Sequence, residues 1–186
     1  MGGPPGPMGV VRIVEAAPGD LDAVLQVERL AFAREDEARL VADLLQDPTA
    51  QPGLSLLAYV GEEPAGHALF TPVRIEDAGC EVPAQILAPL AVVPKFQRQG
   101  VGRALIEHGA SLLGDRGVGL VFVLGDPDYY RRRGFMPTRP LGLLPPYPVE
   151  PDAAWRVRIL RPMPAGSLAG TVQCARSLCK PEYWRE

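Results

Sequence analysis

The segment AVVPKFQRQGVGRALIEHG, at positions 91–109, places two glycines where an amphipathic helix should begin. Glycine costs about 1 kcal/mol relative to alanine inside a helix, so Gly100 and Gly102 need a geometric reason. The first turn of a helix leaves backbone N–H groups without partners and carries partial positive charge, so phosphate binds there readily. Glycines remove the Cβ atoms that would hold an anion away, and Arg98 and Arg103 can add charge-assisted contacts. The segment therefore predicts a phosphate site; the alternative is that the glycines only permit tight strand-to-helix packing.

Two common nucleotide motifs are excluded at this turn. The dinucleotide fingerprint G-x-G-x-x-G is incomplete, because no third glycine follows Gly102 at the required spacing. The lysine and hydroxyl of a P-loop are also missing, which argues against a nucleotide kinase or hydrolase.

Composition limits the kinds of protein and of partner that this sequence allows. The 186 residues are 47% hydrophobic and 22% charged, as expected for one folded domain over residues 10–186, and the start MGGPPGPMG predicts a disordered tail over residues 1–9. The net charge of −3 gives no general attraction to nucleic acid or membranes. Cys80, Cys174 and Cys179 match neither an even disulfide set nor a zinc site. No signal peptide or membrane span is recognisable, so we expect a cytoplasmic protein without metal, nucleic-acid or membrane partners.

Hydrophobic periodicity predicts an α/β order of elements. Strands are expected over 10–14, 54–60, 65–75, 84–93, 118–125 and 153–160, with helices over 21–32, 35–46 and after Gly100. The strand-turn-helix-strand order around Gly100 predicts a parallel pair, and Pro89 predicts a bulge or a lost partner in its strand. In the helix after Gly100, an apolar face is expected to contain Val101, Ala104, Leu105, His108 and Leu112. The proline-rich residues 136–152 show little periodicity and predict an irregular loop. After residue 170 the sequence predicts a strand followed by a short terminal helix.

Two segments resemble a known family. LAVVPKFQRQGVGRALI is similar to the central acetyl-CoA motif of the GCN5-related N-acetyltransferases (GNAT), Gln/Arg-x-x-Gly-x-Gly/Ala, matched at Gln97, Gly100 and Gly102. LGDPDYYRRRGF resembles the tyrosine-containing segment that this family places before a Gly-Phe pair. WRVRIL and GHALFTPV suggest a bacterial subgroup of small predicted acetyltransferases, and the resemblance covers most of residues 10–172.

The resemblance implies a fold and a cosubstrate. The expected fold is the GNAT fold, a mixed, strongly twisted sheet whose central parallel strands splay apart so that pantetheine lies in the gap. Acetyl-CoA is the implied cosubstrate, and no metal is implied. Its pantetheine arm would lie along Leu90, Ala91 and Val92, and its pyrophosphate would be held by Gln97, Arg98, Gln99, Gly100, Val101, Gly102 and Arg103.

The resemblance also implies direct acetyl transfer to an amine, with Tyr130 hydrogen-bonded to the leaving sulfur as catalytic acid and Tyr129 in a packing role. The asparagine that often stands seven residues earlier is Val123 here. A lysine-like amine must lose its proton at pH 7, which costs about 4.6 kcal/mol. The strand over 84–93 carries no acid where many members have one; Gln85 is the nearest polar residue.

Glu28 is the first substitute for the missing base, because burial on its helical face would raise its pKa. The alternative is a structural carboxylate bonded to the backbone or an arginine. Asp126 reads as a loop acid or a helix N-cap. His67 and His108 read as packed histidines, and Arg131–Arg133 as a solvated face rather than a contact to the 3′-phosphate.

The acceptor is expected to be a small-molecule or peptide amine, in a pocket shaped by the segment AFAREDEARL and the loop near Tyr147. A homodimer is a further expectation from the family. The rival hypothesis is a non-catalytic acyl-CoA-binding sensor or partner-binding module with the same fold.

Overall fold

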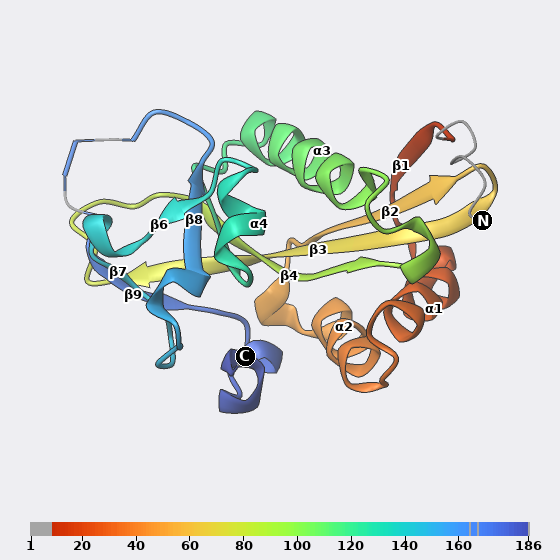
Figure 1. Cartoon of the computed structure of the whole chain (residues 1–186). Helices are drawn as coiled ribbons and strands as arrows, with labels where there is room; N and C mark the ends of the chain where they lie inside the picture. The colour runs from red at the N-terminus through yellow and green to blue at the C-terminus, as the bar shows by residue number, and fades with distance from the viewer. Residues whose placement is uncertain (1–8, 164, 167, 186) are drawn as a thin grey trace.

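The computed structural model describes residues 9–163, 165–166 and 168–185, so the tail predicted over residues 1–9 lies outside the described residues apart from Gly9. A mixed sheet runs through the molecule (Figure 1). Its strands lie in the order β1 (Val11–Glu15), β2 (Leu54–Val60), β3 (Glu63–Glu76), β4 (Ala84–Val92), β5 (Leu120–Leu124), β8 (Trp155–Ile159) and β6 (Met136–Pro137). The distal end of β3 also pairs with β9 (Gly170–Gln173), which pairs with β7 (Leu143–Leu144).

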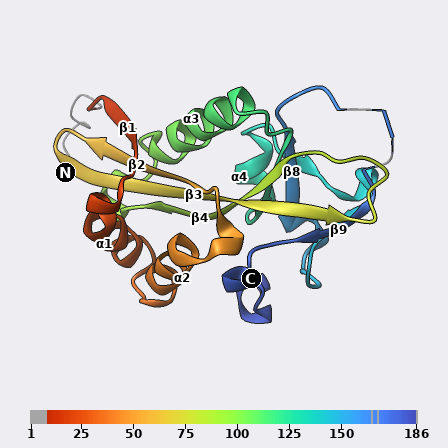
Figure 2. The ribbon, with the colours of Figure 1, turned by 180° about the vertical axis from the view of Figure 1, so that it is seen from behind.

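Helices cover both faces of this sheet. Both ribbon views place α1 (Leu21–Phe32) and α2 (Asp36–Gln46) on one face and α3 (Val101–Asp115) on the other (Figures 1 and 2). The short helix α4 (Pro127–Arg131) follows β5. Single 3-10 turns occupy Pro18–Asp20, Pro48–Ala50, Pro94–Phe96, Arg139–Leu141, Asp152–Ala154, Arg176–Leu178 and Pro181–Trp184.

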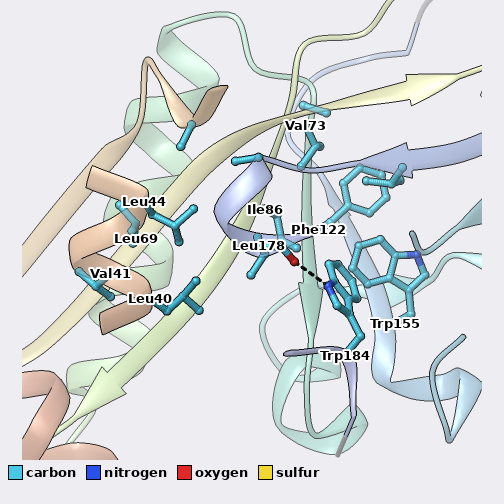
Figure 3. Close-up of a cluster of buried hydrophobic side chains, with 14 of the residues drawn as sticks. Leu40, Val41, Leu44, Leu69, Val73, Ile86, Phe122, Trp155, Leu178 and Trp184 are labelled. Atoms are coloured by element: carbon cyan, nitrogen blue, oxygen red, sulfur yellow. Dashed lines mark hydrogen bonds between the residues drawn. The ribbon is translucent and has the colours of Figure 1, made fainter. Parts of the chain in front are cut away.

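The two helix layers bury separate apolar clusters. The α1–α2 side contains Trp155 stacked on Phe122 at 5.1 Å between ring centroids, and Trp184 packs edge-on against Trp155 at 5.6 Å. Figure 3 shows the Trp184 indole donating to the Leu178 carbonyl, at 3.0 Å, beside side chains from α2. The segment after β9 is thereby fixed to the core, although it forms 3-10 turns rather than the single short helix that the sequence predicts.

The buried face of α3 differs from the predicted one. Val101, Leu105, Ile106 and Leu113 are buried, whereas Ala104 and Leu112 are only half-buried. The prediction of a packed His108 is wrong, because this side chain is exposed. The physical reason is Gly109, where a Cβ would collide with the ring of Phe70. Because Gly109 has no side chain, α3 packs closely against β3 at this residue, and the neighbouring His108 side chain points to solvent.

The parallel pair separates where the sequence contains Pro89. β4 pairs with β5 only over Ala84–Ile86, while its other edge follows β3 as far as Val92. The ladder between β3 and β4 shifts register opposite Ala88 and Pro89, which confirms the predicted irregularity. Beyond Ile86, therefore, the edge of β4 that faces β5 has no strand partner among the described residues.

Candidate active site

The glycine turn, over residues 97–100, is exposed and connects β4 to α3. Gly100 has φ = 85° and Arg98 has φ = 61°, so both lie in the left-handed region, and the space around a Gly100 Cβ is open. Helix α3 begins at the next residue, and no side chain caps its N-terminus. The side chains of Arg98 and Arg103 are exposed. The turn thus combines unpaired helix-start N–H groups with local positive charge, as an anion site requires.

Gly102 has a second reason to be glycine. A Cβ at this position would lie 2.5 Å from the Tyr129 hydroxyl oxygen. The guanidinium of Arg133 stacks on the Tyr129 ring at 3.5 Å from its centroid and donates to the Tyr129 carbonyl at 2.7 Å. Burial raises the pKa of Tyr129, and the neighbouring Arg133 offsets this only in part. Tyr129 therefore keeps its proton and offers a neutral hydroxyl beside the turn.

The run of three arginines is only partly a solvated face. Arg131 and Arg132 are exposed, as the sequence predicts, but Arg133 is half-buried. Its stacking on Tyr129 brings a third cation close to the glycine turn. Tyr129 and Arg133 are four residues apart, a spacing that allows side chains to touch on a helix. The sequence does not predict this contact, because the segment before Gly134 is too short to indicate a helix.

A cleft of about 880 Å³ opens where β4 and β5 separate. Its floor includes β4 from Ile86 to Leu90 and the end of β5 at Leu124. Charged side chains of both signs come from the α1–α2 connection, from α2 and from the C-terminal segment; they are Arg34, Asp36, Glu37, Arg39, Asp43, Lys180, Glu182 and Arg185. The cleft can therefore receive a polar or charged molecule over an apolar floor.

Tyr130 lines this cleft and is 8% exposed. Its ring packs edge-on against Phe135 and Tyr129, with centroids at 5.4 Å and 5.0 Å. Gly125 makes room for it, because a Cβ there would lie 2.6 Å from the Tyr130 ring. The start of α4 is held by Asp126, which accepts from the N–H groups of Asp128 and Tyr129; this confirms the N-cap reading of Asp126.

Glu28 is fully buried, as its helical face predicts, but its partner is neither backbone nor arginine. Its Oε1 lies 2.5 Å from Nδ1 of His67, which is also 0% exposed, and Nε2 of His67 lies 2.9 Å from the Ser55 hydroxyl. Burial raises the pKa of Glu28, while the hydrogen bond and charge of His67 oppose the shift. The reading of His67 as a packed histidine is confirmed, and Glu28 does not line the large cleft.

Glu37 is a cleft carboxylate that the sequence does not predict. It lines the cleft from α2 and pairs with Arg34 at 2.9 Å through Oε1, while its Oε2 is buried without a hydrogen-bond partner. Its charge contributes to the raised pKa of Glu28 behind it. A helical acid among exposed charges gives no sequence signal that it faces a cleft.

The sequence matches the acetyltransferase (GNAT) domain family over residues 12–138, which is more than half of the chain. The chain belongs to the GNAT acetyltransferase family. It is 42% identical over 159 residues to the uncharacterized N-acetyltransferase YjhQ of Escherichia coli K12, covering 84% of this chain and 87% of YjhQ. It is 38% identical over 125 residues to the uncharacterized N-acetyltransferase YhbS of the same strain, covering 67% and 71%.

Solved structures agree with this assignment. The GNAT structure of Escherichia coli YhbS, in complex with CoA, superposes with a TM-score of 0.80 at 28% identity and covers 97% of each chain. A GNAT acetyltransferase from Brucella melitensis, in complex with acetyl-CoA, superposes with a TM-score of 0.71 at 28% identity, covering 91% of this chain and 99% of its own. The resemblance and the fold inferred from the two sequence segments are thus confirmed.

Three further features of this GNAT chain concern possible metal ligands, membrane-spanning helices and the cysteines. No group of three or more possible metal-ligating side chains occurs within the described residues. Over the same parts of the chain, no helix is long and apolar enough to cross a bilayer. Cys174 and Cys179 lie side by side, with 3.5 Å between sulfurs, outside the lining of the cleft.

Proposed function

We propose that this chain transfers the acetyl group of acetyl-CoA directly to a primary amine bound in the 880 Å³ cleft. The observation that carries the proposal is that the edge of β4 loses its β5 partner beyond Ile86, lines the cleft from Ile86 to Leu90, and leads into the glycine turn at the start of α3. Support also comes from the two superposable GNAT structures, which hold CoA and acetyl-CoA.

Backbone groups fit the cosubstrate at two places. The turn from Gln97 to Arg103 offers N–H groups and the cations Arg98 and Arg103 to a pyrophosphate. The edge of β4 over Leu90–Val92 offers peptide groups to the amides of an extended pantetheine arm, which would take the place of a missing strand. Bound acetyl-CoA supplies an activated acetyl group as a thioester.

Side chains of the cleft would give a proton to the departing thiolate and take one from the amine. The Tyr130 hydroxyl would donate to the departing thiolate, since a phenol of pKa about 10 and a thiol of about 8.5 are closely enough matched. The amine must lose a proton, and Glu28 is the base expected from the sequence. Glu37 stands closer to the role, because it lines the cleft and has a buried oxygen without a partner. Comparing Glu37→Gln with Glu28→Gln would separate the two carboxylates.

A thiol-release screen with acetyl-CoA and a panel of amines tests the proposal. The panel should include small amines, polyamines and peptides with free N-termini, since the cleft carries charges of both signs. We expect amine-dependent release of CoA with an equal amount of acetylated amine found by mass spectrometry. Binding of acetyl-CoA without turnover of any amine would instead favour a non-catalytic acyl-CoA-binding module. Direct transfer also predicts that replacing Cys80, Cys174 and Cys179 by alanine changes turnover by no more than a few-fold.

A further inference from the structure

A second cavity lies between the α1–α2 layer and the sheet, and it shares no lining residue with the proposed substrate cleft. It has a volume of about 360 Å³, is partly open to solvent, and is lined by α1, α2, β2, β3 and the segments before α1 and before β2. Most of its wall is apolar, with Leu21, Val24, Leu44 and Leu69 among the contributors. We call it the Ser55 cavity, because the half-buried side chain of Ser55 lies in its wall.

Behind Ser55 stand the two buried groups described above. Ser55 faces the α1–α2 layer from β2, His67 faces it from β3, and Glu28 approaches from α1. Burial raises the pKa of Glu28, and the hydrogen bond and charge of His67 oppose this shift. In the ionised form the carboxylate can only accept, so Nδ1 of His67 donates to Oε1 across 2.5 Å, while the buried Oε2 has no hydrogen-bond partner. Nε2 is then left as an acceptor for the Ser55 hydroxyl at 2.9 Å. The result is a serine, histidine and carboxylate in hydrogen-bonded series, with only the serine reaching a cavity.

The cavity also contains a hydroxyl that the fold does not use. Thr71 is 1% exposed and lines the cavity, and its Oγ1 has no hydrogen-bond partner. On β3 it lies two residues beyond Leu69, which pairs with Ser55 in the sheet. A buried hydroxyl without a hydrogen-bond partner lowers the stability of the fold, and a molecule bound in the cavity could accept or donate the missing hydrogen bond.

We propose that Ser55 is an activated nucleophile in a second site, which hydrolyses small uncharged esters with short acyl chains. The cavity volume lies within the range of small-molecule sites. Its apolar wall favours an uncharged molecule, because the one charged residue of the wall, Glu15, is exposed and already paired with Arg116. This site lies outside the cleft proposed for acetyl transfer, and ester hydrolysis there requires no acetyl-CoA.

The reaction balances with the groups present and with water. The Ser55 oxygen forms a bond to the ester carbonyl carbon while its proton passes to Nε2 of His67. The Thr71 hydroxyl donates to the developing oxyanion. Collapse breaks the ester C–O bond, and the alcohol leaves with the proton from His67. A water molecule then attacks the acyl-serine, giving the carboxylic acid and restoring the Ser55 hydroxyl.

Labelling of the full-length protein tests this site without any acetyl-CoA. The purified chain is treated with a fluorophosphonate and, separately, with p-nitrophenyl acetate, and the labelled residue is found by peptide mass spectrometry. We expect one label per chain, on Ser55, and release of p-nitrophenol. Ser55→Ala should abolish both, whereas Ser111→Ala, at an exposed serine on α3, should change neither.

Two further measurements separate reactivity from a merely structural hydrogen-bond array. Thr71→Val keeps the side-chain shape and should lower the labelling rate by about tenfold or more, with a melting temperature at least as high as that of the wild type. Acetyl-CoA binding should be the same in the wild type and Ser55→Ala, which shows that the variant is folded. Labelling at any other residue, or equal ester hydrolysis by the wild type and a folded Ser55→Ala, would overturn the proposal.

Discussion

Tyr130 shows how a single residue combines packing with access to the cleft. Two aromatic rings and the bare backbone of Gly125 fix its ring, yet the side chain lines the substrate cleft. The neighbouring Tyr129 has a different environment, because its hydroxyl lies at the glycine turn. The two adjacent tyrosines thus face different parts of the proposed site.

Removing only the Tyr130 hydroxyl is predicted to impair chemistry rather than binding. Tyr130→Phe keeps the ring packing, so kcat should fall by roughly 10²–10⁴ while acetyl-CoA affinity is nearly unchanged. Tyr129→Phe is the matched control, and it should affect acetyl-CoA affinity more than kcat. Steady-state kinetics and calorimetry measure these effects. A Tyr130→Phe enzyme with more than about half of the wild-type kcat would show that water or the amine protonates the thiolate.

At the level of helices and strands, the sequence was most informative where its pattern was long and periodic. Helices α1 and α2 and strands β2 and β4 lie within about two residues of their predicted bounds, because periodicity and the Asp47–Pro48 stop agree there. The C-terminal turns were not predicted, since they form through tertiary contacts such as that between Trp184 and Leu178. Glu37 and Arg133 could not be placed at the site for the same reason: their surroundings depend on distant elements.

The end of α2 and the C-terminal segment are joined by Asp47. One carboxylate oxygen accepts from the N–H and hydroxyl of Thr49, and the other from the N–H and hydroxyl of Ser177. Burial alone would raise the pKa of Asp47, but these four hydrogen bonds outweigh it and lower the pKa to about 2. The ionised carboxylate therefore holds two elements together that are remote in the sequence.

This lowered pKa predicts a specific pH dependence of stability. The folded pKa lies below the unfolded value, so ionised Asp47 stabilises the fold above about pH 4, and the contribution is lost as the pH falls towards 2. Asp47→Asn should lower the free energy of unfolding at pH 7 by about 1 kcal/mol or more. The difference from wild type should shrink as the pH is lowered from 5. Urea unfolding over this range measures it, with Asp43→Asn, an exposed site on the same helix, as the control; a difference independent of pH would contradict the account.

Across the whole molecule, the C-terminal segment closes the core and also forms one wall of the cleft. Trp184 is 2% exposed, packs on Trp155 and lines the cleft with its neighbours Lys180 and Glu182. Folding of the core and the shape of the proposed acceptor site therefore both depend on this side chain.

Trp184→Ala is predicted to affect both stability and acceptor binding. Loss of a buried tryptophan should lower the free energy of unfolding by about 3 kcal/mol or more. The KM for the amine should rise, while acetyl-CoA affinity should change little, because the glycine turn lies outside the cleft lining to which Trp184 belongs. Trp184→Phe keeps a ring and loses the hydrogen bond to Leu178, so its effects should be smaller. Equal weakening of both substrates would argue against a separate acceptor wall.

The glycine turn as the cosubstrate site is the central claim, and calorimetry of acetyl-CoA binding tests it most directly. Gly100→Glu adds a side chain and a negative charge where the pyrophosphate is expected, so affinity should fall at least about tenfold, or about 1.4 kcal/mol. Gly61→Glu is the matched control, because Gly61 also has positive φ and open space but lies in the β2–β3 turn. The account predicts weak binding by folded Gly100→Glu and wild-type binding by Gly61→Glu. Unchanged affinity in Gly100→Glu would contradict it.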